Sequence, residues 1–246
     1  MSMKNLIFDN WSGSWVEHPT KPPFRVPIPK FLTIGRVQVP VIGTFDTGVI
    51  SMRVLSYFDI PIPDGEVWLT YAILYSDFSY VGIYSCLSVF DGTRDSYCYE
   101  SSRIGGNTYI ASLLIPLRGG WSLRFKLSYN APRSFRVPGF RLDPSVVSVF
   151  GGVYNVPANT RSDVYTRPVD DKYRVFMYGH STGDGANSGC VQIGGLPAGG
   201  YEYVSLACST YYAEWNGARD DWHKIAILNE AEEARNYLAV GLEVVI

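Results

Sequence analysis

Prolines and glycines occur throughout this chain and constrain its fold more than any other feature. Its 246 residues include 15 Pro and 24 Gly, and turn sequences such as Pro63-Asp64-Gly65 and Asp91-Gly92-Thr93 separate short apolar runs. Proline fixes φ and lacks a backbone donor, and glycine favours turns, so neither suits the interior of a long helix. The runs between the turns are rich in Val, Ile, Tyr, Leu and Phe, which favour strands. The sequence therefore predicts an all-β protein of antiparallel strands.

The expected strands form two series, separated by a segment rich in Pro and Gly over residues 131–165. They are Val49–Phe58, Glu66–Tyr75, Tyr80–Phe90, Ser96–Glu100, Tyr109–Pro116, Ser122–Tyr129, Ser145–Phe150, Tyr173–Tyr178, Cys190–Ile193, Tyr201–Thr210, Trp222–Leu228 and Leu238–Ile246. Hairpin spacing of this kind is typical of an antiparallel β-sandwich, either jelly-roll-like or immunoglobulin-like. Only Glu230–Asn236 favours a helix, and it is barely two turns long, so we expect very little helix.

The domain organisation predicted from these series has three parts. Residues 1–43 hold many prolines and form an extended Pro-rich N-terminal arm, which lies along the edge of its own domain or along a neighbour. Residues 44–150 and 151–246 form two sandwich units. A single large β domain over residues 44–246 is the alternative, because all-β domains of this length are common.

The charge composition argues against several classes of partner. Charged residues make up 18% of the chain and the net charge is −2, with no basic run, whereas soluble domains carry roughly 25% charged residues. Binding to a phosphate backbone needs a basic surface, so we do not expect nucleic acid as a partner. No stretch of 18 apolar residues predicts a membrane span, and the N-terminus lacks the apolar region of a secretory signal.

The first cysteine pair is placed symmetrically about a turn. Cys86 and Cys98 are equidistant from Gly92, and a hairpin closed at Gly92 would put Cys86 directly opposite Cys98 and Ser88 opposite Ser96. Directly opposed residues in an antiparallel pair have Cα atoms about 4.5–5.5 Å apart, which is within reach of a disulfide. The spacing therefore predicts a Cys86–Cys98 disulfide.

The second cysteine pair repeats this arrangement, because Cys190 and Cys208 are equidistant from Gly199. We predict a Cys190–Cys208 disulfide on the same argument; four buried free thiols are the alternative. Disulfides persist in oxidising environments. Without a secretory signal, two disulfides favour a virion or an extracellular surface as the location; the alternatives are an intracellular protein of a hyperthermophile and a chain whose leader has been removed.

Two short motifs resemble catalytic signatures but lack the context that the chemistry needs. Gly179-His180-Ser181-Thr182-Gly183 matches the nucleophile elbow of hydrolases, which requires a following helix, but a loop of small residues follows it here. Asp46-Thr47-Gly48 matches the aspartic protease motif, but that chemistry needs two such carboxylates and the chain has one copy. We interpret both as turns and predict that the chain is not an enzyme.

The three histidines, His18, His180 and His223, have no metal-ligand spacing. The acidic residues of the loops likewise lack the spacing of a calcium loop. We therefore expect no metal and no cofactor.

One loop combines aromatic residues with amides and charges. Its candidate ligand or interface residues are Tyr211, Tyr212, Trp215, Asn216, Arg219, Asp221 and Trp222. Aromatic rings stack on sugars while carboxylates and amides bind hydroxyls, but Trp, Tyr and Arg are also enriched in protein interfaces. The leading prediction is a non-enzymatic structural protein of a virus particle (capsid, turret or tail component) or a similar extracellular assembly, with copies of itself or other virion proteins as partners. The alternative is a carbohydrate- or receptor-binding, lectin-like module that binds glycans.

Overall fold

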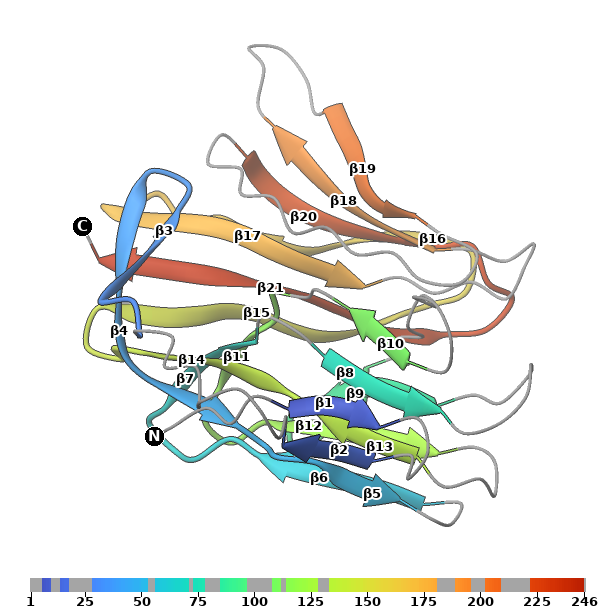
Figure 1. The fold of residues 1–246 in the computed structure, drawn as a ribbon. Coiled ribbons are helices and arrows are strands. Elements are labelled where there is room, and N and C mark those ends of the chain that lie inside the picture. Colours follow the sequence, from blue (N-terminus) through green and yellow to red (C-terminus); the bar gives the residue numbers. More distant parts are fainter. Residues whose placement is uncertain are drawn as a thin grey trace.

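The structure is a computed structural model that describes residues 6–9, 14–17, 28–52, 56–70, 73–77, 85–96, 108–111, 114–127, 133–180, 189–195, 202–208 and 222–245. Every regular element in these residues is a strand, and the strands pair antiparallel (Figure 1). They are β1 (Leu6–Asp9), β2 (Ser14–Glu17), β3 (Phe31–Ile34), β4 (Val37–Asp46), β5 (Ile50–Met52), β6 (Ser56–Pro61), β7 (Val67–Thr70), β8 (Ile73–Asp77), β9 (Ser85–Phe90), β10 (Thr108–Ala111), β11 (Pro116–Arg118), β12 (Ser122–Leu127), β13 (Arg133–Arg136), β14 (Pro138–Leu142), β15 (Val147–Val156), β16 (Thr160–Thr166), β17 (Lys172–His180), β18 (Gly189–Gly195), β19 (Glu202–Cys208), β20 (Trp222–Asn229) and β21 (Arg235–Val245). The predicted all-β antiparallel fold is confirmed. No helix long and apolar enough to cross a membrane occurs in the described residues.

The N-terminal part of the fold is a sandwich with jelly-roll topology. Two sheets, β10-β8-β13-β5 and β11-β7-β14-β4-β3, continue into one another. The strands β10, β8, β13 and β5 are next along the chain to β11, β7, β14 and β4, in the same order. The sheet β6-β12-β9 faces them, and the rings of Phe125 in β12 and Phe135 in β13 meet with centroids 4.6 Å apart. From β4 to β14 the chain alternates between the two faces, as in a jelly roll.

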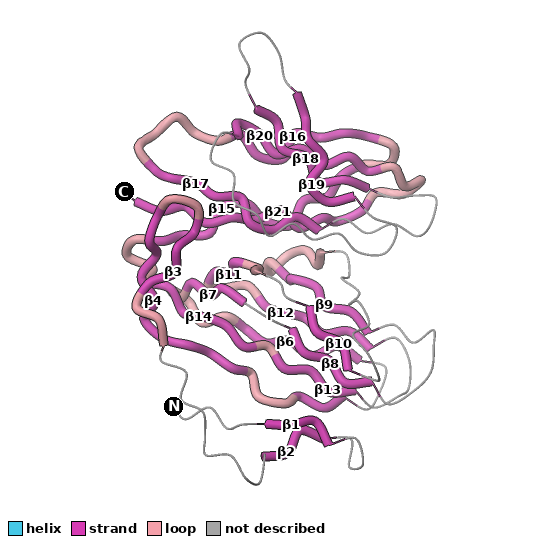
Figure 2. Tube along the Cα trace, turned by 45° about the horizontal axis from the view of Figure 1, so that its top comes forward, coloured by secondary structure: helices cyan, strands magenta, loops and turns pink. Residues whose placement is uncertain are grey.

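A second pair of sheets stacks on this sandwich (Figure 2). The middle sheet, β15-β21-β17, turns one face toward the jelly roll, where Val149, Val175 and Leu242 join its core. Its other face carries Phe176 and Tyr237 into a second core, shared with the sheet β16-β20-β18-β19. The middle sheet is therefore buried on both faces, which explains why β21 is an almost continuous apolar run.

Gly241 leaves room for the Phe150 ring on the middle sheet. It pairs with Phe150 on one neighbouring strand and Phe176 on the other. A Cβ at Gly241 would overlap the Phe150 ring and the carbonyl oxygen of Val175. A glycine is therefore required by this close approach.

The predicted domain boundaries fall inside strands. Residue 43 lies within β4 and residue 150 lies within β15, and one core includes Leu142 and Val240 from either side of residue 150. Residues 31–43 were expected in an extended arm, but they form the β3–β4 hairpin of a sheet. The tip of this hairpin lies against β17: the backbone N–H of Arg36 donates to the Tyr173 hydroxyl at 3.4 Å, and the guanidinium lies 4.8 Å from the ring centre.

The predicted helix over Glu230–Asn236 is wrong. Its first residues form a bend and the last two begin β21. The buried side chain of Asn229 causes this, because its amide donates to the carbonyls of Val156, Pro157 and Glu233, and its oxygen accepts from the N–H of Ala231. Local bonds of this kind compete with helical ones.

Candidate functional site

The aromatic loop predicted to bind a ligand or partner lies almost entirely outside the described residues. Tyr211, Tyr212, Trp215, Asn216, Arg219 and Asp221 are not described. Trp222 is described and is only 3% exposed; its ring stacks on Phe150 at 5.5 Å and lies 5.9 Å from Tyr165. Trp222 is therefore a core residue and not part of an exposed cluster, which corrects the prediction for this residue.

The two cysteine pairs differ in what the structure says of them. Cys190 lies directly opposite Cys208 in the β18–β19 ladder, so the register that the predicted disulfide needs is present. A bulge at Val191 and Gln192 follows, which shifts the rest of the ladder by one residue. The disulfide itself stays a prediction.

The register predicted for the first cysteine hairpin is wrong at its turn. Phe90 pairs with Asp95, and the Ser96 N–H donates to the Val89 carbonyl, so Ser88 does not lie opposite Ser96. The cause is the Asp91 carboxylate, which accepts hydrogen bonds from the backbone N–H groups of Thr93 and Arg94. These bonds close a loop with an even number of residues, so the turn is not centred on Gly92.

The predicted Cys86–Cys98 disulfide lies partly outside the described residues. Cys86 lies in β9, whereas Cys98 is not described. This disulfide therefore also stays a prediction.

The Asp46-Thr47-Gly48 motif is a structural turn. The Asp46 carboxylate forms a bidentate ion pair with Arg136 and accepts from the Gly48 N–H, while the Thr47 hydroxyl accepts from the Val137 N–H. These bonds join the turn after β4 to β13 and to Val137, the residue between β13 and β14. Ser181 of the other motif is not described.

The outer edge of the β3–β4 hairpin carries exposed apolar residues. β3 is the last described strand of its sheet. Phe31 pairs with Pro40, and Ile42 lies two residues further along β4, where the ladder to β14 is irregular. Phe31 is 51% exposed and Ile42 is 56% exposed. We call Phe31, Pro40 and Ile42, with the flanking Lys30 and Arg36, the hairpin edge.

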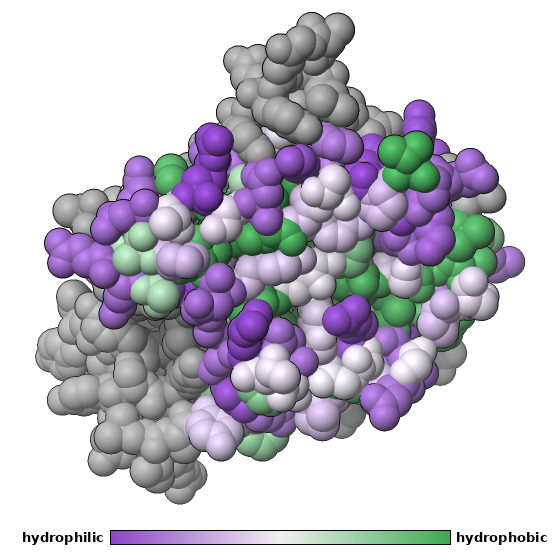
Figure 3. Space-filling view, turned by 180° about the vertical axis from the view of Figure 1, so that it is seen from behind, coloured by the Kyte–Doolittle hydropathy of each residue, from purple (hydrophilic) through white to green (hydrophobic). Residues whose placement is uncertain are grey.

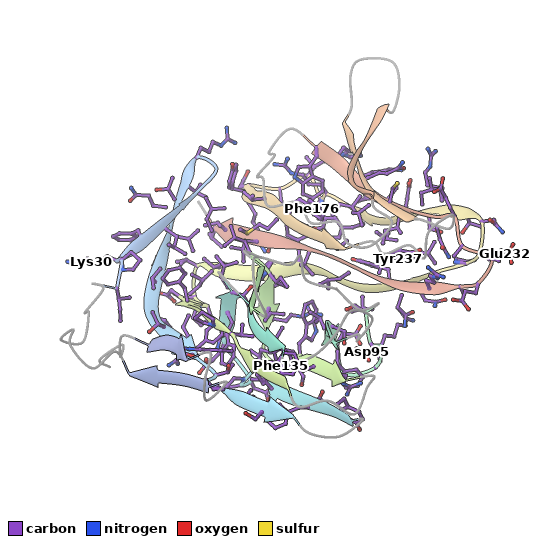
Figure 4. All side chains as sticks on the ribbon, turned by 45° about the vertical axis from the view of Figure 1, so that its right-hand side comes forward. Lys30, Asp95, Phe135, Phe176, Glu232 and Tyr237 are labelled. Atoms are coloured by element: carbon purple, nitrogen blue, oxygen red, sulfur yellow. The ribbon has the colours of Figure 1, made fainter. Side chains whose placement is uncertain are left out.

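The hairpin edge lies at one end of the molecule. Figure 4 shows Lys30 at that end, beside β3, and Glu232 at the opposite end. Seen from behind in Figure 3, the side that carries β3 and β4 is on the right, and green hydrophobic surface alternates with purple there. An exposed apolar strand edge is a typical site for pairing or packing with another chain.

A second cluster combines aromatic and charged groups on the β6-β12-β9 sheet. The Arg124 guanidinium binds both Asp59 oxygens at 2.7 and 2.8 Å and Asp95 at 3.4 Å, between the rings of Tyr57 and Phe90. The Asp59 hydrogen bond raises the pKa of Arg124. Because these acids occupy its nitrogens, the cluster holds three strands together rather than presenting a free cation.

A third charged cluster closes one end of the middle sheet. Arg174 is nearly buried and binds Asp170 at 2.6 Å and also Glu243, which in turn binds Lys172 at 2.6 Å. Hydrogen bonds from Arg174 lower the pKa of Asp170 to about 2. Burial raises the pKa of Glu243, but Lys172 and Arg174 outweigh it and the pKa is lowered. These contacts are structural.

Within the residues that the structure describes, no group of three or more His, Cys, Asp or Glu could hold a metal ion. The hairpin edge, which no sequence motif marked, is therefore the strongest candidate site. Its signal in the sequence is an apolar residue, Phe31, at the position that alternates with Leu32 and Ile34, which pack in the core.

Comparisons with known proteins give two remote structural likenesses. No family model and no curated protein sequence matches the chain. The major capsid protein P2 from Bacteriophage PM2 is 10% identical, with a TM-score of 0.39 over 82% of this chain and 98% of that protein. A fucolectin from the serum of Morone saxatilis (striped bass) is 11% identical, with a TM-score of 0.27 over 80% of this chain and 85% of the lectin.

Proposed function

We propose that this chain is a non-enzymatic structural subunit of a virus particle, or of a similar extracellular assembly, that binds other copies of itself or neighbouring proteins of the particle. The observation that carries the proposal is the hairpin edge, where Phe31 and Ile42 are half exposed on the last described strands of a sheet. Burial of such residues against another subunit removes apolar area from water, at about 25 cal/mol per Å². Ile34 and Val39 of the same hairpin are buried in the core, which holds the hairpin in place.

Substitution of the edge tests this proposal. Phe31→Ser with Ile42→Thr removes apolar area without touching the core, and self-association measured by sedimentation velocity should weaken at least about tenfold. The matched control is Val169→Thr, because Val169 is fully exposed in another loop. Unchanged association in the edge variant, with the wild type associating, would assign the contact to another surface.

The glycan-binding alternative has one described observation in its favour. Trp222, the last of the candidate residues, is buried, and its carbonyl accepts from Arg167 at 3.3 Å. We propose that Trp215 and Asp221, which precede it in the sequence, would contact the sugar. Loss of glycan-array binding on Trp215→Ala with Asp221→Asn, with self-association intact, would favour a lectin; a wild type that binds no glycan would exclude it.

If the chain functions outside a reducing compartment, as proposed, Cys190 and Cys208 should form a disulfide. The test is alkylation of the unfolded protein with and without prior reduction, followed by peptide mass spectrometry. Protection of both cysteines before reduction is expected, and alkylation of both without a reductant would contradict the proposed location.

A further inference from the structure

The strand β6 has a free edge. Among the described strands it pairs with β12 alone, and it is the last strand of the sheet β6-β12-β9. At the end of this ladder the Ile62 N–H donates to the Trp121 carbonyl. Because the backbone groups of successive strand residues point in opposite directions, those of Tyr57, Asp59 and Pro61 face away from β12. The edge therefore offers backbone donors and acceptors to a further strand.

The inner face of β6 carries an aromatic ring that is only half covered. Phe58 pairs directly with Phe125, which is fully buried, so both side chains point into the sandwich. Phe58 is nevertheless 44% exposed. The reason is its place at one side of the sandwich: β5 is the last strand of the facing sheet, and Figure 1 shows β5 and β6 together at the lower side of the jelly roll. An exposed ring at such an edge is suited to contact with another chain.

The outer face of β6 offers an aromatic ring and a carboxylate whose charge is already compensated. Tyr57 is 64% exposed, and the Arg124 guanidinium lies 4.6 Å from its ring centre. The same guanidinium binds both oxygens of Asp59, two residues further along β6. A partner that covers Asp59 therefore buries a paired charge and not an isolated one.

From these features we infer that β6 pairs antiparallel with β6 of a second copy, about a two-fold axis at Phe58. In this register Tyr57 of each copy lies opposite Asp59 of the other, and their free N–H and C=O groups bond reciprocally. The two Phe58 rings meet on the inner face, while each Tyr57 covers the paired Asp59 on the outer face. The result is an isologous dimer in which the two β6-β12-β9 sheets become one continuous sheet.

Pro61 and the charges select this register over the next one. A pair centred on Asp59 would place two carboxylates directly opposite each other, which destabilises a strand pair. It would also place Pro61, which has no N–H, opposite Tyr57 and leave a carbonyl without its donor. With the axis at Phe58, Pro61 lies beyond the bonded residues and ends the ladder.

This contact uses a different surface from the hairpin edge, so it goes beyond the proposed function and can be tested separately from it. The variant with Phe31→Ser and Ile42→Thr removes the hairpin contact. By sedimentation velocity this hairpin variant should still form a dimer through β6. If the hairpin edge were the sole contact, the same variant would be a monomer.

Charge at the two-fold axis is the decisive test. Phe58→Lys and Phe58→Asp each place like charges opposite themselves across the axis, so in the hairpin variant each should weaken dimerisation at least about tenfold. An equimolar mixture of the two places Lys opposite Asp and should recover a dimer, which misfolded variants could not do. The control, Val169→Lys, adds a charge at a fully exposed loop position and should leave the dimer unchanged.

The other outcomes separate the two contacts. If the hairpin variant is a monomer at every concentration while the wild type associates, the β6 contact is wrong and the proposed function stands. If the hairpin variant associates like the wild type and Phe58→Lys abolishes that association, the β6 contact stands and the hairpin edge is not a contact. Weakening by both Phe58 substitutions without recovery in the mixture would rule out an axis at Phe58, and dimerisation unaffected by Phe58→Lys would rule out β6.

Discussion

The middle sheet and the β3–β4 hairpin use similar apolar residues in opposite ways. In β21 nearly every side chain is buried, because one face packs on the jelly roll and the other on the sheet β16-β20-β18-β19. In β3 exposed and buried residues alternate, and the exposed set still includes Phe31. An apolar residue thus specifies the fold in the first region and is available to a partner in the second.

A matched pair of truncations should break this comparison most clearly. Leu242 in β21 is fully buried, whereas Ile42 in β4 is 56% exposed. Leu242→Ala should lower the free energy of unfolding by about 2–5 kcal/mol, because it leaves a cavity. Ile42→Ala should change it by less than about 0.5 kcal/mol. Urea denaturation measures both, and equal losses would contradict the assignment of Ile42 to a partner surface.

Asn229, which supports the second core, should be nearly as sensitive to substitution. Asn229 binds three carbonyls and also accepts from the Tyr237 hydroxyl at 2.7 Å. Asn229→Ala strands these groups and should cost about 2–4 kcal/mol by urea denaturation. The control is Asn155→Ala, in an exposed pair with Asn236, which should cost less than about 0.5 kcal/mol.

The contact between the hairpin tip and the middle sheet should have a smaller effect. Tyr173→Phe removes the acceptor for the Arg36 N–H but keeps the ring beneath the guanidinium. We expect a loss of about 0.5–1 kcal/mol, with faster hydrogen exchange at residues 34–37 by mass spectrometry. Unchanged exchange there would show that the tip is held by other contacts.

The smallest effect expected is the acid response of the Arg174 cluster. The pKa of Asp170 is lowered to about 2 from an ordinary 3.8. Its contribution to stability is therefore complete above about pH 4 and is lost as the pH falls toward 2. Asp170→Asn should flatten the decrease in the free energy of unfolding between pH 4 and 2. A slope identical to that of the wild type would show that Asp170 does not contribute to the acid response.

Much of the fold was predictable, because strand position follows from apolar runs and turn residues. Cys190–Ile193 and Trp222–Leu228 lie within β18 and β20. The strands β13, β14 and β16 were missed, since Arg133–Leu142 and Thr160–Thr166 are polar or contain proline and gain their pairing from neighbours.

The site was harder to predict, because single side chains decide it through distant contacts. Asn229 converts a segment with helix-forming residues into a bend by binding carbonyls of β15 and the following turn. Asp91 closes a hairpin loop with an even number of residues, which shifts the strand register by one residue. Trp222 is predicted as a surface residue because its neighbours in sequence are polar, but it is part of the second core.

The most direct test of the account is the absolute mass of the purified wild-type protein by light scattering over a wide concentration range. The account predicts a mean mass above that of the 27.4 kDa chain that rises with concentration. A monomer of 27.4 kDa at every concentration would contradict it.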